Sequence, residues 1–328
     1  MSDTFTERIL VIKHGALGDF ILATGPIQAI RNHHPDAHIT LMTTAAYAGL
    51  AEQGGWFNDI WVDSRPKLWQ PGAWLELRHW LNSSGFDRVY DLQTSSRTSW
   101  YFKLLSDPKP EWSGIAPGCS HPHANEFRND LHTIERQAEQ LQMAGVEDVP
   151  APNVDFLTSD ISRFNLEGRY GLLVPGGAAH RPGKRYPAVA YRELSRHMVQ
   201  QGYTPVVIGA DAEADVCAEV VRDVPEAINL CGQTSLADIA ELARGAQVTI
   251  GNDTGPMHLI APTGCKTVVL FSTDSDPKRC GQRGPDVTVL RAMMTSGIPF
   301  LDVVQAAELG GWINEPMGTQ PIHMDPLD

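Results

Sequence analysis

Short runs of β-branched and apolar residues alternate with amphipathic helical patterns along nearly the whole chain of 328 residues. Ile9–Ile12 and His38–Met42 predict strands, and a helical pattern from about Phe20 to Asn32 lies between them. Strands that alternate with helices of this length are typical of parallel sheets covered by helices. The alternation therefore predicts an α/β fold.

The same order of elements continues to about residue 308. In the first half we predict two further strands, Asp59–Val62 and Phe86–Leu92. The further helices predicted there are Ala73–Leu81, Ser99–Leu105 and Asp130–Met143, and the segment 106–125 is predicted to be irregular. The predicted strands of the second half are Tyr170–Val174, Pro205–Ile208, Ala227–Leu230, Val248–Ile250, Lys266–Phe271 and Asp286–Leu290. The predicted helices there are Ala188–Gln201, Ala212–Arg222, Leu236–Arg244, Met257–Ala261 and Phe300–Glu308.

One segment interrupts the alternation. Val149–Asn153 holds two prolines in three residues, which resist both helix and sheet. The chain length also favours two domains. We therefore predict one domain over 1–152, a second over 153–310 and a tail over 311–328. Two parallel sheets joined in this way would face each other across a cleft at their carboxyl edges, where α/β proteins bind ligands.

Composition excludes several classes of protein. Lys and Arg number 26 against 39 Asp and Glu, a net charge of −13, which argues against nucleic acid as a partner and against a strongly polybasic membrane binder. The five cysteines are scattered without a CxxC pair, which fits a reducing compartment. No apolar run has the length of a membrane span, and residues 1–8 lack the layout of a secretory signal. We expect a cytoplasmic protein without metal or cofactor.

The first of three glycine-bearing turns is Gly15–Asp19, which follows a predicted strand and precedes an apolar helix. Gly15 and Gly18 would let the backbone approach a ligand closely, and a helix N-terminus favours anions. Asp19 could act on a ligand, or it could only stabilise the helix as an N-cap or first-turn acid. The residues alone leave both interpretations open.

The second turn, Pro175–Pro187, follows the strand at 170–174. The amides of Gly176 and Gly177 beside Lys184 suit a phosphate group, whereas a plain basic surface loop is the alternative. It is not a Walker A loop, because five residues separate Gly177 from Gly183 and Arg185 replaces the magnesium-binding Ser or Thr.

The third turn, Gly251–His258, supplies a carboxylate, a hydroxyl, free amides and an imidazole within a few residues. These come from Asp253, Thr254, Gly255 and His258. A helix cap or a simple chain turn would not need the whole set, so the sequence favours a binding turn.

Five tryptophans crowd into 25 residues of the first half: Trp56, Trp61, Trp69, Trp74 and Trp80. We expect most of them to pack in the core, and an exposed one could line an acceptor or membrane-facing surface. Cys119, His121 and His123 match no established zinc spacing, so we predict no metal site there.

In order, the three turns resemble glycosyltransferase family 9, the bacterial ADP-heptose:lipopolysaccharide heptosyltransferases. The matching stretches are ILVIKHGALGDFILATGPIQAI, DLQTSSRTS, VPGGAAHRPGKRYP and IGNDTGPMHLIAPTGCKTVVLF, and the similarity runs from about residue 9 to 308. The resemblance implies the GT-B fold, in which two Rossmann-like domains face each other across a cleft. It places the acceptor on the N-terminal domain and the nucleotide-sugar on the C-terminal domain.

The resemblance also implies the reaction. A heptose or related sugar would pass from an ADP-sugar to a lipopolysaccharide core or similar glycan, with inversion and without a metal ion. Asp19 matches the proposed catalytic base, and Lys184 matches the lysine on the donor diphosphate. Glu213 resembles the acid that contacts the donor ribose, and Asp253 the residue that holds sugar hydroxyls. The family's phosphate-binding turn matches Thr254, Gly255 and His258.

The chain departs from the family at the second turn. Hydroxyl residues commonly precede the matching lysine, but this chain has Ala178, Ala179 and His180, and Tyr186 stands where Trp is common. Two alternatives therefore stay open: the same family with a UDP- or GDP-hexose donor, and a non-catalytic nucleotide-sugar-binding module. The expected partners are a nucleotide-sugar, with ADP-heptose first, and a glycan or glycolipid acceptor. A peripheral contact with the inner membrane is also left open.

Overall fold

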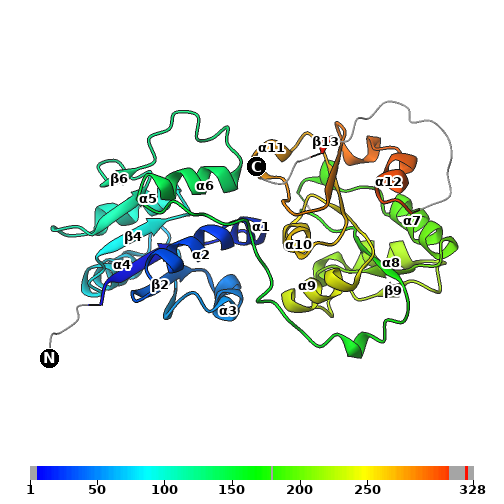
Figure 1. The fold of residues 1–328 in the computed structure, drawn as a ribbon, viewed down its shortest axis with the longest axis horizontal. Coiled ribbons are helices and arrows are strands. Elements are labelled where there is room, and N and C mark those ends of the chain that lie inside the picture. Colours follow the sequence, from blue (N-terminus) through cyan, green and yellow to red (C-terminus); the bar gives the residue numbers. More distant parts are fainter. Residues whose placement is uncertain (1–5, 179, 310–321, 324–328) are drawn as a thin grey trace. The chain divides into compact units, whose positions relative to one another are not determined.

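A computed structural model describes residues 6–178, 180–309 and 322–323 (Figure 1). The chain divides into two compact units, Met1–Pro152 and Asn153–Asp328, which we call the N-terminal and C-terminal units. The predicted tail at 311–328 lies outside the described residues apart from Ile322 and His323.

The N-terminal unit is built on a parallel sheet of six strands in the order β3-β2-β1-β4-β5-β6. The strands are β1 (Arg8–Ile12), β2 (His38–Thr43), β3 (Asp59–Val62), β4 (Arg88–Asp91), β5 (Glu111–Gly114) and β6 (His121–Pro122). The helices are α1 (Leu17–Leu22), α2 (Thr24–His33), α3 (Ala45–Gly54), α4 (Pro71–Ser83), α5 (Ser96–Leu104) and α6 (Thr133–Gln142).

The sequence predictions were wrong at three places in this unit. The single helix predicted from Phe20 to Asn32 is two helices, because Pro26 has no N–H for an intrahelical bond and α2 therefore restarts at Thr24. Helix α3 was missed, since Gly49 and Gly54 weaken its pattern. The segment 106–125, predicted as irregular, contains the short strands β5 and β6.

The C-terminal unit has seven strands in the order β13-β12-β11-β10-β7-β8-β9, and only the β12–β13 pair is antiparallel among the described residues. The strands are β7 (Tyr170–Val174), β8 (Thr204–Val207), β9 (Ile228–Asn229), β10 (Thr249–Asn252), β11 (Thr267–Phe271), β12 (Val287–Arg291) and β13 (Ile322–His323). The helices are α7 (Ala188–Gln200), α8 (Ala214–Val221), α9 (Leu236–Gly245), α10 (Gly255–Ile260), α11 (Pro277–Cys280) and α12 (Phe300–Ala306).

The six parallel strands of each sheet share one order, the doubly wound 3-2-1-4-5-6 order of Rossmann-like sheets, and the second sheet adds the antiparallel strand β13. The order reverses between β1 and β4 in the first sheet and between β7 and β10 in the second. In such sheets ligands bind at the carboxyl ends of the strands at this reversal. The predicted turns after β1, β7 and β10 all begin at these positions.

The sheets are covered by apolar side chains on both faces. Trp112 and Tyr101 are fully buried in the N-terminal unit, as Tyr191 is in the C-terminal unit. Of the five crowded tryptophans, Trp56 is buried, Trp69 is 74% exposed, and the others pack against the core while staying partly exposed. None of the five cysteines forms a disulfide. No helix among the described residues has the length and hydropathy that crossing a bilayer requires.

Candidate active site

The turn after β1 needs glycine at its first position. Gly15 has φ of +106°, and a Cβ there would lie 2.0 Å from Cε2 of Tyr47. The Tyr47 ring stacks on Phe20 of α1 at a centroid distance of 5.7 Å. The turn is therefore packed tightly against its own helix, and Gly18 is buried within α1.

Asp19 lies in the first turn of α1 and is not its N-cap, which is Ala16. A carboxylate in a first helical turn is stabilised by the helix dipole. Its side chain is partly exposed. The N-cap interpretation of Asp19 is therefore wrong. Two interpretations from the sequence remain: action on a ligand, or stabilisation of the helix by a first-turn carboxylate.

Lys13 lies beneath this turn and was not among the predicted site residues. Its side chain is buried, and its ammonium donates a hydrogen bond to the carbonyl of Leu92 at 3.3 Å. Burial lowers the pKa of Lys13 to about 8, and the negative charge of Asp19 opposes that fall. Asp19 thus has a buried cationic neighbour in Lys13. The hydrophobic pattern of the sequence does not indicate that this lysine is buried.

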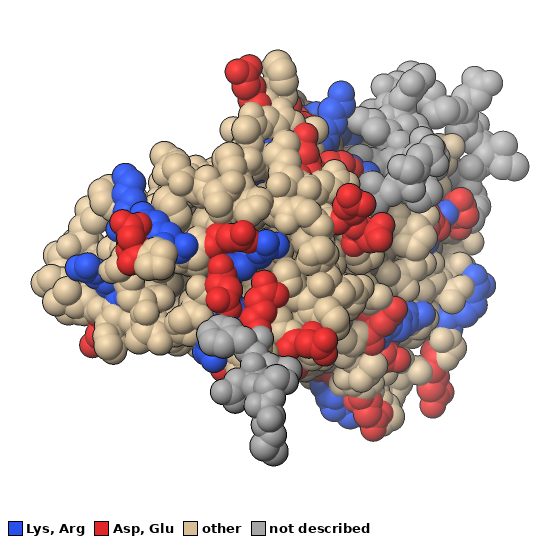
Figure 2. Space-filling model, turned by 60° about the vertical axis from the view of Figure 1, so that its left-hand side comes forward, with Lys and Arg blue, Asp and Glu red and all other residues tan. Residues whose placement is uncertain are grey.

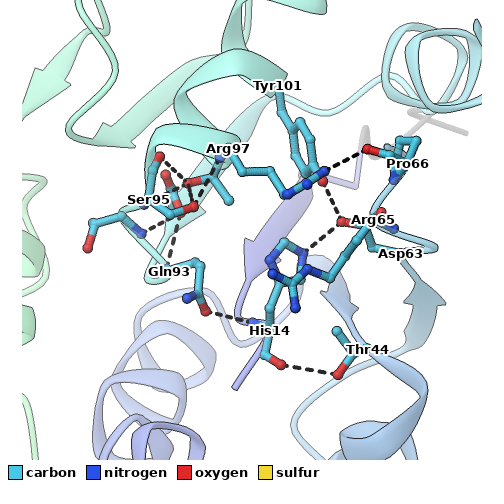
Figure 3. A network of polar contacts seen from close by, with 12 residues as sticks. His14, Thr44, Asp63, Arg65, Pro66, Gln93, Ser95, Arg97 and Tyr101 are labelled. Atoms are coloured by element: carbon cyan, nitrogen blue, oxygen red, sulfur yellow. Dashed lines mark hydrogen bonds and ion pairs between the residues drawn. The ribbon is translucent and has the colours of Figure 1, made fainter. Parts of the chain in front are cut away.

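A polar network lies at the same carboxyl edge of the first sheet, with Asp63 at its centre (Figure 3). One oxygen of the Asp63 carboxylate accepts a hydrogen bond from the Tyr101 hydroxyl at 2.6 Å and lies 2.9 Å from Nε2 of His14. The other accepts one from the backbone N–H of Arg65 at 2.7 Å. Burial raises the pKa of Asp63, but the bonds from His14 and Tyr101 outweigh it and hold the pKa below its ordinary value.

Two residues of this network, His14 and Arg65, line a pocket of about 670 Å³. The pocket is lined by His14, Arg65, Pro66, Leu68, Trp74, Gln93, Ser95, Ser96, Arg97, Trp100 and Leu104. Arg97 donates a hydrogen bond to the Pro66 carbonyl at 2.9 Å, which fixes the loop after β3 against α5. Indole rings beside guanidinium groups suit a ligand with an apolar ring face and a polar or anionic edge.

The turns after β7 and β10 meet in the C-terminal unit through an ion pair. The ammonium of Lys184 lies 2.5 Å from one oxygen of Asp253, and both side chains are largely buried. The Ser275 hydroxyl donates to the same oxygen at 2.6 Å, and Gln282 donates to the other at 3.1 Å. Burial raises the pKa of Asp253, but Lys184 and Ser275 hold it below its ordinary value. Ser275 and Gln282 were not predicted.

Glu213 holds the second turn in place. Its carboxylate accepts hydrogen bonds from the N–H of Gly177 at 2.7 Å and the N–H of Ala210 at 2.9 Å. A Cβ on Gly176 would lie 1.9 Å from Oε1 of Glu213. Gly176 therefore has to be glycine for the carboxylate to reach this position.

Asn252, which the sequence did not single out, joins the second turn to the third. Its side-chain amide donates to the carbonyls of Pro175 and Gly176 at 2.8 and 2.9 Å. Its side-chain oxygen accepts from the N–H of Tyr186 at 3.0 Å. The two turns therefore form a single preorganised unit.

The rest of the third turn surrounds this pair. Thr254 is the N-cap residue of α10, and its buried hydroxyl makes no hydrogen bond within the described part of the chain. Gly255 begins the helix and His258 is buried within it. In the second turn Ala178 and His180 are exposed, whereas Ala179 lies outside the described residues.

The structure therefore brings the predicted residues together in two groups. Gly15, Gly18 and Asp19 belong to the N-terminal unit, and all the others belong to the C-terminal unit. In the described parts of both units, no cluster of three or more His, Cys, Asp or Glu side chains is placed to hold a metal ion. His123 instead pairs with Glu139 at 2.7 Å.

Comparison with known proteins identifies the family that this arrangement resembles. The profile described as "Glycosyltransferase family 9 (heptosyltransferase)" matches residues 74–300. Lipooligosaccharide heptosyltransferase 2 of Campylobacter jejuni subsp. jejuni serotype O:2 is 30% identical over 262 residues, which cover 78% of this chain and 77% of the relative.

Two solved structures share the fold. A glycosyl transferase of family 9 from Veillonella parvula is 22% identical with a TM-score of 0.79, covering 92% of this chain and 96% of its own. The E. coli heptosyltransferase WaaC with ADP-2-deoxy-2-fluoro heptose is 19% identical with a TM-score of 0.72, covering 92% and 99%. The predicted fold class, α/β with two Rossmann-like domains of the GT-B type, is confirmed.

Proposed function

The chain belongs to glycosyltransferase family 9 and is a glycosyltransferase, and from that premise we propose that it transfers a heptose or a related sugar from an ADP-sugar to a lipopolysaccharide core or similar glycan. We propose further that the transfer inverts the anomeric centre and needs no metal ion. Relatives named as heptosyltransferases of lipopolysaccharide or lipooligosaccharide support the sugar and the acceptor. A structural neighbour bound to an ADP-sugar analogue supports the nucleotide. A cytoplasmic location is part of the proposal.

The Lys184–Asp253 ion pair is the observation that carries the proposal. It lies at the strand-order reversal of the second sheet, beside a glycine turn that Glu213 and Asn252 hold rigid. A largely buried cation beside a turn that is held in place in this way is suited to a diphosphate. Because Asp253 orients Lys184 before the donor arrives, little reorganisation is needed when the diphosphate binds.

In the proposed reaction an acceptor hydroxyl attacks the anomeric carbon of the donor while Asp19 takes up its proton. The bond between the anomeric carbon and the diphosphate oxygen breaks, and the electron pair leaves with the nucleoside diphosphate. Lys184 stabilises the negative charge that develops there, a role a divalent cation fills in other enzymes. Attack opposite the leaving group inverts the anomeric centre.

The pocket lined by His14, Arg65 and Arg97 is the proposed site of the acceptor. Arg65 and Arg97 supply cationic edges, and Trp74 and Trp100 supply flat apolar faces. His14 and Arg65 are held by their contacts with Asp63, so this part of the pocket does not have to form when the acceptor binds.

Two measurements test the proposal. A thermal-shift panel of ADP, UDP and GDP should show selective stabilisation by ADP, and selective stabilisation by UDP or GDP would assign a different donor. ADP release from ADP-heptose should depend on a lipopolysaccharide core acceptor and should persist in EDTA. Tight ADP binding without release from any nucleotide-sugar would leave a non-catalytic binding module.

A further inference from the structure

Three large apolar side chains are exposed on one surface of the N-terminal unit. Leu68 is 90% exposed, Trp69 is 74% exposed, and Trp100 is 58% exposed. Leu68 and Trp100 also line the pocket that His14 and Arg65 line, and their exposure places them at its rim. Together with Lys67 and Lys103 we call this surface the Trp69 patch. Contiguous exposed apolar patches mark interaction surfaces, whereas single exposed apolar side chains are normal.

Hydrogen bonds hold the loop that carries the patch. The indole N–H of Trp74 donates to the Lys67 carbonyl at 3.1 Å, and the N–H of Lys67 donates to the Gln70 side chain at 2.8 Å. Arg97 fixes Pro66 from α5. The loop is therefore held from both sides, and Leu68 and Trp69 stay exposed in an ordered segment.

Each exposed indole has a lysine beside it. The ammonium of Lys67 lies 5.3 Å from the centroid of the Trp69 ring, and that of Lys103 lies 4.5 Å from the centroid of Trp100. Tryptophan prefers the boundary between hydrocarbon and headgroups, while lysine can extend its stem over apolar surface and keep its charge in water. The pairing suits a surface that is apolar on one side and anionic on the other.

The charge of this region differs in sign from that of the chain. Residues 65–103 contain six basic and three acidic residues, within a chain of net charge −13. Figure 2 shows Lys and Arg side chains at several places on the face it presents, with Asp and Glu side chains among them. An anionic surface would attract the patch and repel much of the remaining surface.

We propose that the Trp69 patch docks the protein on the anionic headgroups of a phospholipid bilayer. Trp69 and Leu68 would enter the boundary between headgroups and acyl chains, and Lys67 and Lys103 would bind lipid phosphates. The pocket rim would then lie at headgroup level, where the sugar of a glycolipid acceptor is presented. The inference rests on the proposed function only for that last step.

The first experiment is co-sedimentation of the full-length protein with vesicles of phosphatidylcholine alone or with added phosphatidylglycerol. We expect binding to the anionic vesicles only, with its loss at 1 M salt, where the screening length is about 3 Å. Lys67→Gln with Lys103→Gln should weaken binding about 30-fold, and Trp69→Ala should weaken it by about 10-fold. Arg196→Gln with Arg222→Gln, and Phe127→Ala, are matched controls that change exposed groups elsewhere and should bind normally.

The second experiment separates this inference from the proposed function. Trp69→Ala should keep its turnover on a deacylated, soluble core oligosaccharide and lose turnover on the same acceptor carried in vesicles. Loss on both acceptors would make Trp69 an acceptor contact and overturn the docking role. Equal binding of wild type and patch variants to anionic vesicles would overturn it as well. So would a dimer in sedimentation equilibrium that Trp69→Ala dissociates, because a second copy would then cover the patch.

Discussion

Asp19 has different neighbours in the structure from those that an N-cap would have. Ala16 is the N-cap of α1, so the backbone N–H groups of the first turn receive no side-chain cap. Buried Lys13 is close enough for the Asp19 charge to affect its pKa. At the scale of one residue, the structural role left to Asp19 is therefore a favourable interaction with the helix dipole.

Asp19→Asn separates this structural role from catalysis. Losing one charge at the helix N-terminus should cost about 0.3 to 1 kcal/mol of stability. Loss of a general base should lower turnover by about 10²- to 10⁴-fold. The measurements are ADP release with a competent acceptor, ADP affinity and melting temperature. ADP affinity should be unchanged, because the predicted nucleotide-binding residues belong to the C-terminal unit.

Asp36→Asn is the matched control, since it removes an exposed carboxylate from the same unit. It should leave turnover and stability unchanged. Normal turnover in a folded Asp19→Asn protein would show that Asp19 stabilises α1 and that another group accepts the proton.

Lys184→Ala should change stability in a pH-dependent way. In the wild type the pKa of Asp253 is below its unfolded value, so its stabilising contribution is present above the unfolded pKa and lost as pH falls through the folded pKa. Without Lys184 the burial of Asp253 dominates and raises its pKa. The variant should lose about 3 kcal/mol at pH 7 and less at pH 5, where Asp253 can take up a proton.

Urea unfolding of both proteins at pH 5 and pH 7 measures this difference. Adding Asp253→Asn to Lys184→Ala should restore much of the stability at pH 7, because the buried charge is then gone. A loss that is equal at both pH values would mean that Lys184 contributes through packing alone. Turnover of Lys184→Ala should fall about 10²- to 10³-fold.

At the scale of elements, the second turn depends on the missing Cβ of Gly176. The Glu213 carboxylate fills that space and binds the N–H groups of two successive loops, one before η3 (Asp211–Glu213) and one after β7. The position of the second turn is thus set by the side chain of Glu213, which lies 36 residues after Gly177 in the sequence. The sequence around Gly176 and around Glu213 does not indicate that the two residues lie against each other.

Gly176→Ala should therefore displace Glu213 and destabilise the turn. We expect a loss of about 1 to 3 kcal/mol, as for other insertions into packed sites, together with weaker ADP binding. Chemical unfolding and ADP titration check both effects. In combination with Glu213→Ala the two losses should be far from additive, because the smaller side chain leaves room for the new methyl group.

Gly72→Ala provides the comparison for this substitution. Gly72 lies in α4, and a Cβ added there would have no other atom within 4 Å, so alanine should be neutral or slightly stabilising. If Gly176→Ala behaved like Gly72→Ala, the carboxylate of Glu213 would have to move without cost. The close approach would then have no role in holding the turn.

At the scale of the whole molecule, the sequence predicted most of the architecture because both sheets follow a local pattern. Alternating strands and helices, the proline segment and three glycine turns can all be read within short windows. The missing parts depend on long-range pairing. Asp63 binds a hydroxyl 38 residues away, and Asn252 binds a carbonyl 76 residues away. Such partners become visible only when the strand order is known.

Dependence on long-range pairing also explains why the sequence did not predict the residues that line the pocket of the N-terminal unit. Arg65, Trp74 and Arg97 come from the loop after β3, from α4 and from α5, and no spacing in the sequence unites them. They meet because β3 and β4 lie on either side of the β2–β1 pair, with their carboxyl ends at the same edge. The three glycine turns were found because each holds its chemistry within a few residues.

The predicted nucleotide-binding residues and the proposed acceptor residues belong to different units, and this leads to a prediction for ADP binding to the full-length protein. The predicted nucleotide-binding residues all lie in the C-terminal unit, on the loops at 175–187, 209–213 and 252–258. Hydrogen exchange with ADP at 100 times its dissociation constant should slow in these loops, and the site should gain about 2.7 kcal/mol. The turn at 15–19 and the loop at 63–70 should exchange as before, since none of the predicted nucleotide-binding residues lies in them. Lys184→Ala at the same ADP concentration should show less protection. Protection centred on residues 15–19 would contradict the assignment and place the nucleotide on the first sheet.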